Sequence, residues 1–476
     1  MSEPTPVPPI PRPRGDERDL TTGPIAGHVR ALAIPTALSL LFITLYNVTD
    51  TLFAGQISTE AQAGLGLGGQ LFFAVAALGI GFRIGAASVV GQLIGKGDLE
   101  RARCASAQTM LLAVVTTVGA MLAAPFALEP LIDVVAQGRP YGDSAHSYVH
   151  LLLWSTPAYV VAYALSGIQQ AVGDAKTLAR AQAVATLSNV GLNPLLVWGI
   201  PGVWGGLGLD GIALSTVVCQ TGLLLFMLGV AWGSTPFAGF HLGRLRPDPS
   251  LLLDLLQQIL PGTLRLLVIA VGGFIAQIWL RDGGDDAVAA YNVGLRLEQL
   301  LLLPAIGITA ALLPFTSQNM GAAKPERVRD GFWISTGYAT ALLVSGTLFV
   351  WTMGPTVVGW FGAGAAAEGH ALDYLRVESV VFPLFALLFG LQNLLQGLKR
   401  PLWPLVIGLW RQGLAVALFG YLYVRMLGMG PYGVWLTVAS GVVTGTVMIL
   451  AVSLHLLPRE GLDLRPAWLG GPQETP

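Results

Sequence analysis

The sequence predicts an all-α integral membrane protein with about twelve transmembrane helices in two related six-helix lobes. Three observations carry this prediction: the composition is strongly apolar, long apolar stretches recur along the chain, and the second half repeats the first. Of the 476 residues, 53% are hydrophobic and only 11% are charged, whereas about a quarter of the residues are charged in ordinary soluble domains. So few charges cannot build a water-facing surface for a chain of this length.

Apolar stretches of about 20 residues, the length that an α-helix needs to cross a bilayer, recur from one end of the chain to the other. A transmembrane β-barrel would instead show alternating segments of about 10 residues. Polar breaks separate the expected helices, which lie near residues 28–53, 61–94, 103–128, 144–172, 177–199, 206–232, 252–280, 287–319, 329–360, 371–397, 402–424 and 432–456.

The basic residues between these helices predict the orientation. One set of alternate segments carries eighteen of them: Arg12, Arg14, Arg18, Arg30, Lys96, Arg101, Arg103, Lys176, Arg180, Arg244, Arg246, Lys324, Arg327, Arg329, Lys399, Arg400, Arg459 and Arg465. The other set carries only Arg139, Arg281 and Arg425. Cytoplasmic loops are enriched in Lys and Arg, so both termini are expected in the cytoplasm. The net charge of −1 gives no reason to expect nucleic acid as a partner.

An offset of 226 residues aligns the two halves of the chain with each other. The aligned positions include polar, Pro and Gly residues, which an apolar composition does not explain: Pro35 with Pro261, Gly68 with Gly294, Gly81 with Gly307, Gln92 with Gln318, Glu100 with Glu326, Pro157 with Pro383 and Gln170 with Gln396. Both six-helix lobes begin in the cytoplasm, so a pseudo-twofold axis along the membrane normal should relate them, as in many transporters.

The repeat and the polar breaks predict the domain boundaries. A disordered cytoplasmic tail is expected at residues 1–22 and the N-terminal lobe at 23–235. A cytoplasmic linker at 236–250 then leads to the C-terminal lobe at 251–458, which is followed by a cytoplasmic tail at 459–476. The protein is expected to be a monomer.

Four segments resemble the multidrug and toxic compound extrusion (MATE) family of cation-coupled exporters. They are LYNVTDTLFAG at residues 45–55, GQLIGKGD at 91–98, AYNVGLRLEQ at 290–299 and SQNMG at 317–321. The resemblance extends over nearly the whole chain. Within the family, this chain has an Asp late in the first helix and no Glu in the middle of the seventh. This pattern is similar to that of the prokaryotic branch related to DNA-damage-inducible protein F. It implies a multi-pass protein of the prokaryotic cytoplasmic (inner) membrane.

This resemblance also implies an outward-opening V of two lobes, with a cation site in the N-terminal lobe. The family pattern places the first-helix Asp at Asp50, the fifth-helix Asn at Asn189 and the sixth-helix hydroxyl at Thr216. The chain departs from the pattern at Asn193, where the family often has a second Asp before Pro.

The residues themselves support a site at this level. Asp50 lies roughly 22 Å beyond Pro35 by helical rise, and a carboxylate inside a membrane is a functional candidate by default. Asn189 and Asn193 share one helix face, and Thr216 lies at a comparable depth. Together they could offer a carboxylate, two amide oxygens and a hydroxyl to H⁺ or Na⁺. The alternatives are that Asp50 caps a helix end and that the Asn pair joins helices by hydrogen bonds. Pro35 is the expected hinge, because its missing N–H weakens the first helix.

A second polar cluster is expected in the C-terminal lobe. Arg296 and Glu298, with Arg265, Glu378 and Arg411, should pair with one another and fix that lobe, because opposite charges in a low-dielectric interior cost less together than apart. Arg83 has no obvious partner in the sequence; it could reach the membrane surface or approach Asp50.

These features predict a secondary active antiporter that exports amphipathic or cationic organic compounds, xenobiotics among them, in exchange for H⁺ or Na⁺. A lipid or lipid-linked saccharide flippase of the same superfamily is the alternative, and it should carry a cluster of cationic side chains for a pyrophosphate. An enzyme is not expected, because the chain has no His-rich metal motif, nucleophile elbow or Gly-rich phosphate loop. Neither a cofactor nor a metal is expected, and the partners should be a small-molecule substrate and the lipid bilayer.

Overall fold

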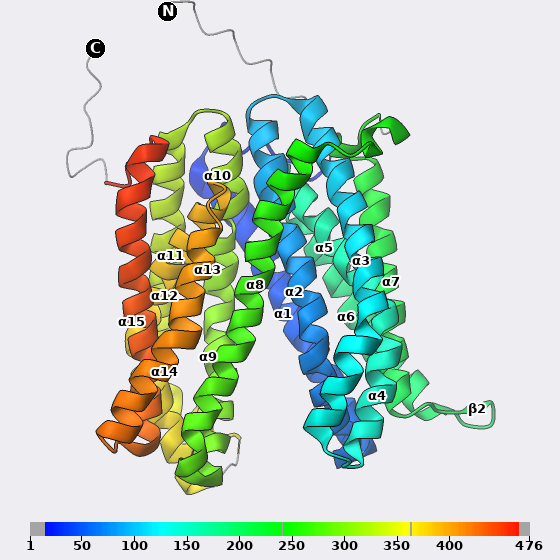
Figure 1. Cartoon of the computed structure of the whole chain (residues 1–476), viewed down its shortest axis with the longest axis vertical. Coiled ribbons are helices and arrows are strands. Elements are labelled where there is room, and N and C mark those ends of the chain that lie inside the picture. The colour runs from blue at the N-terminus through cyan, green and yellow to red at the C-terminus, as the bar shows by residue number, and fades with distance from the viewer. Residues whose placement is uncertain (1–14, 240, 362–363, 466–476) are drawn as a thin grey trace, which may run out of the picture. The chain divides into compact units, whose positions relative to one another are not determined.

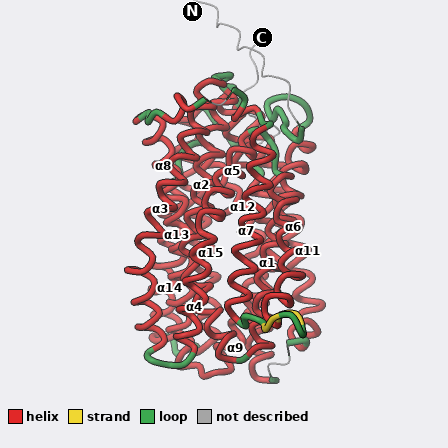
Figure 2. The backbone as a smooth tube through the Cα atoms, turned by 90° about the vertical axis from the view of Figure 1, so that its right-hand side faces the viewer, coloured by secondary structure: helices red, strands yellow, loops and turns green. Residues whose placement is uncertain are grey.

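The computed structural model describes residues 15–239, 241–361 and 364–465. Nearly all of these residues lie in helices, which are red in Figure 2, and one short hairpin supplies the strands. In this hairpin β1 (Gly199–Ile200) pairs antiparallel with β2 (Trp204–Gly205). The prediction of an all-α protein is confirmed.

Each half of the described chain contains six helical segments of membrane-spanning length (Figure 1). Those of the first half are α1 (Ile25–Ile57), α2 (Thr59–Gly95), α3 (Leu99–Ala136), α4 (Tyr141–Leu152) continued by α5 (Thr156–Ala171), α6 (Lys176–Trp198) and α7 (Leu209–Trp232). Those of the second half are α8 (Pro249–Leu280), α9 (Gly284–Ala310) continued by α10 (Leu312–Gly321), α11 (Pro325–Gly359), α12 (Ala365–Gly397), α13 (Leu402–Leu409) continued by α14 (Ala415–Gly420), and α15 (Gly430–Leu456).

Eleven of these segments in the described part of the chain are long and apolar enough to cross a membrane. The exception is α6, which has 23 residues but carries the polar side chains Gln182, Asn189 and Asn193 along its length. A polar membrane helix must bury its hydrogen-bonding groups against other helices. All three of these side chains are buried, which fits a helix that serves a site inside the protein.

Several helices begin at side chains that cap their first turn. Ser58 Oγ accepts a hydrogen bond of 3.0 Å from the backbone N–H of Ala61 at the start of α2. Asp98 Oδ1 does the same for Arg101 at the start of α3, also at 3.0 Å. Such caps satisfy backbone donors that have no partner within the helix. They place the starts of α2 and α3 a few residues earlier than the apolar pattern predicts.

The described residues form two compact units. Unit 1 takes the residues up to Asp19 together with Leu38–Thr263, and unit 2 takes Leu20–Ala37 together with the residues from Leu264 onward. The helices α1 and α8 therefore each contribute their first part to the opposite unit. The lobe boundaries predicted at residues 235 and 251 do not coincide with this division, because packing rather than chain order defines a compact unit.

Glycines let helices approach closely inside unit 1, where α2 packs extensively against α4 and α5. A Cβ atom on Gly167 of α5 would lie 2.4 Å from the carbonyl oxygen of Arg83 on α2. A Cβ atom on Gly81 would lie 2.8 Å from the carbonyl oxygen of Ile259 on α8. Small residues at such crossings are typical of membrane helices. They let α2 pack closely against both α5 and α8.

The core of unit 2 contains three large aromatic side chains. The ring of Tyr374 meets those of Tyr291 and Trp435 edge-on, with centroids 5.7 and 5.1 Å apart. Tyr374 and Trp435 are fully buried. Such pairs add stabilisation beyond the area that they bury, so α9, α12 and α15 form a rigid centre in this unit.

The described residues before α1 are held by hydrogen bonds. Asp16 pairs with Lys176, at 3.1 Å, and with Arg180 on α6. Burial by itself would raise the pKa of Asp16, but the hydrogen bonds from these two cations outweigh it and hold the pKa below its ordinary value of 3.8. Leu20 is fully buried, and its N–H donates to Gln318 Oε1 at 3.0 Å. Of the tail predicted at residues 1–22, residues 1–14 lie outside the described residues, and the rest is packed rather than disordered.

The other two segments predicted to lie outside the lobes are also packed where the structure describes them. In the linker predicted at 236–250, where residue 240 is not described, Arg244 forms an ion pair of 2.9 Å with Glu100. In the tail predicted at 459–476, which is described as far as residue 465, Leu462 is buried and Glu460 pairs with Arg400. Apolar and charged partners that lie far away in the sequence hold these segments.

Candidate functional site

Asp50 is the carboxylate that α1 places inside unit 1. It lies in the C-terminal part of this 33-residue helix, and only 5% of its surface is exposed. A buried carboxylate is costly unless hydrogen bonds or a bound ion compensate it. The groups around Asp50 therefore decide what it can do.

Two asparagines of α6 donate hydrogen bonds to the same oxygen of Asp50. Asn189 Nδ2 lies 3.0 Å and Asn193 Nδ2 2.8 Å from Asp50 Oδ1. Both asparagines are fully buried. They are four residues apart, so one face of α6 presents both amides. The sequence prediction brought these three residues together, and the structure places them in contact.

The second oxygen of Asp50 faces a chain of hydroxyl groups. Thr216 of α7 donates from Oγ1 to Asp50 Oδ2 at 3.3 Å, and Tyr46 donates from its hydroxyl to Thr216 Oγ1 at 3.1 Å. Ser215 Oγ accepts from Asn189 Nδ2 at 3.4 Å. The predicted Thr216 is thus in place. Tyr46 and Ser215 belong to the same network but were missed, although the spacing of Tyr46 four residues before Asp50 puts both on one face of α1.

The orientation of the amides differs from the prediction. The sequence suggested that two amide oxygens would join the carboxylate around a cation, but the amide nitrogens face Asp50 Oδ1 instead. Each amide oxygen accepts from the other asparagine, at 3.3 and 3.4 Å. An amide offers both a donor and an acceptor, and the carboxylate draws the donors toward itself. The geometry is therefore that of a carboxylate held by hydrogen-bond donors.

A cavity of about 260 Å³ opens beside this network within unit 1. Its lining includes Asp50 as the one acidic side chain and Arg83 as the one basic side chain among the residues that the structure describes there. Much of the remaining lining is aromatic: Tyr46, Phe72, Phe73, Tyr148, Tyr159 and Tyr163. Its volume lies near the lower end of small-molecule sites, about 300–1,000 Å³. An apolar and aromatic wall with a few polar groups is typical of such sites.

A comparison with protein families identifies the chain. A model of the MatE family matches it twice, over residues 35–195 and 261–422. The chain belongs to the MatE family. The two matches begin 226 residues apart, from 35 to 261, which is the offset of the internal repeat seen in the sequence. As a member of this family, the chain is a multi-pass membrane transporter of small molecules and not an enzyme.

Curated relatives in this family cover most of the chain. It is 25% identical over 409 residues to the FAD transporter of Shewanella oneidensis, covering 83% of this chain and 87% of the relative. It is 26% identical over 469 residues to the probable multidrug resistance protein NorM of Pseudomonas aeruginosa, covering 93% of each. None of these similarities singles out the branch related to DNA-damage-inducible protein F.

Solved structures show the same fold. A multidrug resistance MATE family transporter of the MOP superfamily aligns with a TM-score of 0.87 at 22% identity, covering 93% of this chain and 98% of that one. A MOP superfamily transporter from Pyrococcus furiosus aligns with a TM-score of 0.85 at 21% identity, with the same coverage. The prediction of a MATE-type membrane protein from the sequence is confirmed.

The charges of unit 2 in this MatE-family transporter form only part of the predicted cluster. Glu298, Glu378 and Arg411 lie close enough to interact electrostatically. Glu298 is buried and accepts a hydrogen bond from the hydroxyl of Tyr374. Arg296, two residues earlier, is exposed, because residues two apart point to different faces of a helix. Arg411 lies over the ring of Phe385, 5.7 Å from its centroid. The prediction that Arg296 and Glu298 share a cluster is therefore wrong.

A buried carboxylate of α12 accepts no hydrogen bond among the described residues. Both oxygens of Glu378 are buried without a hydrogen bond in the described part of the chain, and the carboxylate interacts with Arg411 electrostatically without a hydrogen bond between them. Arg265 instead donates to Gln392 Oε1 at 2.9 Å. In addition, the described residues contain no group of three or more His, Cys, Asp or Glu side chains that could hold a metal ion.

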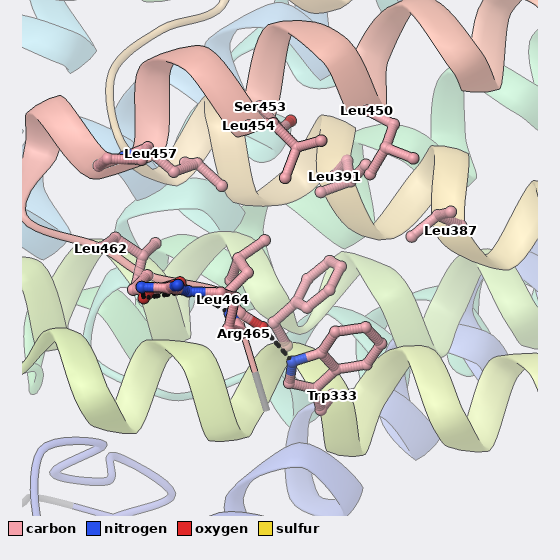
Figure 3. Close-up of a pocket in the computed structure, with 13 residues that line it drawn as sticks. Trp333, Leu387, Leu391, Leu450, Ser453, Leu454, Leu457, Leu462, Leu464 and Arg465 are labelled. Atoms are coloured by element: carbon pink, nitrogen blue, oxygen red, sulfur yellow. Dashed lines mark hydrogen bonds and ion pairs between the residues drawn. The ribbon is translucent and has the colours of Figure 1, made fainter. Parts of the chain in front are cut away.

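A second cavity, of about 320 Å³, lies within unit 2 between α11, α12, α15 and the segment that follows α15 (Figure 3). Leucines from these elements form most of its wall, and Trp333 Nε1 donates to the carbonyl oxygen of Leu464 at 2.7 Å. Its charged side chains, Asp463 and Arg465, pair with each other. This cavity therefore offers no charge for a coupling ion, unlike the cavity beside Asp50.

Proposed function

We propose that this MatE-family transporter is a secondary active antiporter. It exports amphipathic or cationic organic compounds, xenobiotics among them, in exchange for H⁺. The observation that carries the proposal is the single carboxylate of Asp50, buried beside a cavity with aromatic walls and held by donors from α6 and α7. The curated relatives described as multidrug resistance proteins support export of drug-like compounds.

The arrangement favours a proton over Na⁺ as the coupling ion. A sodium ion must lose its hydration shell, and several oxygen ligands with enough negative charge must replace that shell. Here the amide nitrogens of Asn189 and Asn193, rather than their oxygens, face Asp50. Asp50 supplies the one full negative charge of the cavity lining. A single proton neutralises it without further ligands, whereas Na⁺ would require both amides to turn.

Proton binding would release the contacts that hold α1 to α6 and α7. Hydrogen bonds to a charged acceptor are stronger than those to a neutral one, so neutralising Asp50 weakens its attraction for Asn189, Asn193 and Thr216. Helix α1 could then bend at Pro35, which leaves one helical hydrogen bond unmade. The cavity of unit 1 would narrow and expel its substrate. A cationic substrate and a proton would thus compete for the same carboxylate.

In the membrane, the proposal places both termini of the chain on the cytoplasmic side of a prokaryotic inner membrane. The loops of the predicted cytoplasmic side carry eighteen Lys and Arg residues, and those of the other side carry three, which fits the positive-inside rule. The monomer is the proposed functional state, because the carboxylate, its donors and the cavity all come from one unit of one chain.

The alternative of a lipid or lipid-linked saccharide flippase is less well supported. Binding a pyrophosphate group calls for several cationic side chains, and Arg83 alone supplies a cation to the cavity lining of unit 1. The similarity to an FAD transporter instead places flavin nucleotides among the compounds to test.

Transport by the purified protein in liposomes tests this proposal. The efflux of a fluorescent organic cation is measured under a proton gradient alone and then under a sodium gradient alone. Proton-coupled antiport predicts accumulation against the cation's gradient in the first condition and none in the second. Accumulation driven by sodium alone would assign the site to Na⁺, and a failure in both conditions would refute antiport.

A further inference from the structure

Arg83 is a charged residue of the unit 1 cavity that the proposed antiport does not use. It lies on α2, is half-buried and lines the cavity. Neither a hydrogen bond nor an ion pair joins its guanidinium to another residue in the described part of the chain. A cation inside a membrane is costly unless it is hydrated or paired. The cavity is therefore the place where this charge can meet water or an anion.

Asp50 is not the partner of Arg83, because the two lie at different depths. The helices α1 and α2 run in opposite directions on either side of Ser58 (Figure 1). By helical rise, Asp50 lies about 12 Å from Ser58, Gly69 about 17 Å and Arg83 about 37 Å. The lining of the cavity on α2 begins at Gly69 and ends at Arg83. The carboxylate and the guanidinium thus mark opposite ends of the cavity, roughly 25 Å apart in depth.

Aromatic rings line the cavity between the Asp50 end and Arg83, and Tyr163 lies at the Arg83 end. Tyr159 and Tyr163 of α5 stack in parallel with ring centroids 5.7 Å apart, and Phe72 meets Tyr159 edge-on at 5.4 Å. Tyr163 packs on Gly79, one helical turn before Arg83, with 3.3 Å to a Cβ built there. Flat aromatic surfaces favour planar ligands, which stack on them or meet them edge-on.

We propose that Arg83 binds an anionic group of the substrate, so that planar aromatic compounds with a phosphate or carboxylate are ligands of this cavity. Arginine presents a planar fork of N–H donors that matches both anions. The aromatic part of the ligand lies against the tyrosines, and its anion meets the guanidinium. The inference rests on the proposed function only in that the same cavity carries the transported compound. It extends the substrate class beyond cations.

A pair of flavins isolates the contribution of the anion. Riboflavin and flavin mononucleotide share the ring system and differ in one phosphate. Their binding to the purified full-length protein is measured by quenching of flavin fluorescence. We expect flavin mononucleotide to bind about 10- to 100-fold more tightly, the range for one or two hydrogen bonds to a charged group. The same comparison between 2-naphthoate and its methyl ester tests a carboxylate in place of the phosphate.

Substitutions at Arg83 then test whether this residue supplies the preference. Arg83→Gln should remove the difference within each pair and leave riboflavin binding near the parent value. Arg83→Lys should keep part of the preference, because the charge remains while the fork is lost. Arg376→Gln is the matched control, since Arg376 lies over the ring of Trp351 in unit 2 and should change none of these values.

The outcomes separate this proposal from the antiport proposal. Equal binding of the two flavins and of the two naphthalene compounds by the parent protein would overturn the anion site, even if the cation is still transported. If Arg83→Gln weakened the binding of both members of a pair by the same factor, the anion site would also be overturned, because Arg83 would then only support the folded structure. A failure of proton-driven cation transport in the parent would refute antiport and leave the flavin comparison intact. A preference seen only with the phosphate pair would support the proposal and narrow it to phosphates.

Discussion

Replacing Asp50 with Asn should abolish proton-driven export while the protein remains folded. The substitution keeps the shape of the side chain and removes its charge. The retained oxygen can still accept from Asn189 and Asn193, and the new amide can donate to Thr216. A neutral amide cannot alternate between a charged and a protonated state, so the step that couples the gradient to transport is lost.

The contacts of Asp50 give the expected size of the effect on stability. Three hydrogen bonds to the carboxylate become neutral ones, at a cost of about 1 kcal/mol each. Removing a charged Asp from the membrane interior returns roughly 2.5–3.5 kcal/mol. The two effects nearly cancel, and the free energy of unfolding should change by about 1 kcal/mol or less. A loss of transport therefore cannot be explained by unfolding.

The assay compares proton-driven accumulation of a fluorescent cation in liposomes with the melting temperature of the same preparation. Asp50→Asn should reduce accumulation to the level of liposomes without protein and keep the melting temperature within a few degrees of the parent. Asp50→Glu retains a carboxylate and should retain dependence on the gradient. Asp210→Asn removes a carboxylate at the N-terminal end of α7 that accepts from Ser147 and serves as the matched control.

One further variant decides between the two units. Glu378→Gln neutralises the buried carboxylate of α12, whose oxygens have no hydrogen-bond partner among the described residues. Near-parental pumping by Asp50→Asn would reduce Asp50 to a structural residue. If Glu378→Gln alone abolished coupling, the proton site would lie in unit 2 and the reasoning from unit 1 would be refuted.

Three other predictions concern packing, pH and topology. Gly167→Ala should lower the free energy of unfolding by about 1–3 kcal/mol through overpacking. The control is Gly222→Ala, where a Cβ meets nothing within 4 Å, and it should leave the melting temperature unchanged or slightly raised. Equal melting temperatures for the two variants would contradict the close crossing of α2 and α5. The pKa of Asp16 is lowered in the folded protein, so its ion pairs stabilise above its ordinary pKa of 3.8 and fade as the pH falls below that value. Asp16→Asn should thus cost about 0.5–1 kcal/mol at pH 7, and this cost should shrink steadily as the pH falls below 3.8. A cost that does not shrink in acid would exclude these pairs as its cause. In intact cells, a membrane-impermeant thiol reagent should label a single cysteine at Ser58 and not one at Lys96, and the reverse pattern would overturn the orientation.

The sequence by itself determined the class of the protein and much of the proposed site. So few charges and such regular apolar stretches indicate helices that span a membrane. A bilayer offers no hydrogen-bond partner to backbone N–H and C=O groups, and a helix satisfies these groups internally. The repeat follows from comparing the chain with itself. Asn189 and Asn193 could be paired because their spacing of four fixes a common helix face, and helical rise placed Asp50 and Thr216 at similar depths.

Only the tertiary structure decided how the side chains meet. It turned both amide nitrogens toward Asp50 and connected Tyr46 to Asp50 by way of the Thr216 hydroxyl. It also showed that Arg296 is exposed while Glu298 is buried. It also assigned the first part of α1 to unit 2, and it placed Arg83 in the lining of a cavity, with no hydrogen bond or ion pair to any described residue. Depth and helix face can be read from spacing along one helix. The rotation of neighbouring helices, the direction of an amide and the presence of a counter-charge depend on packing between segments far apart in the chain, which no local pattern encodes.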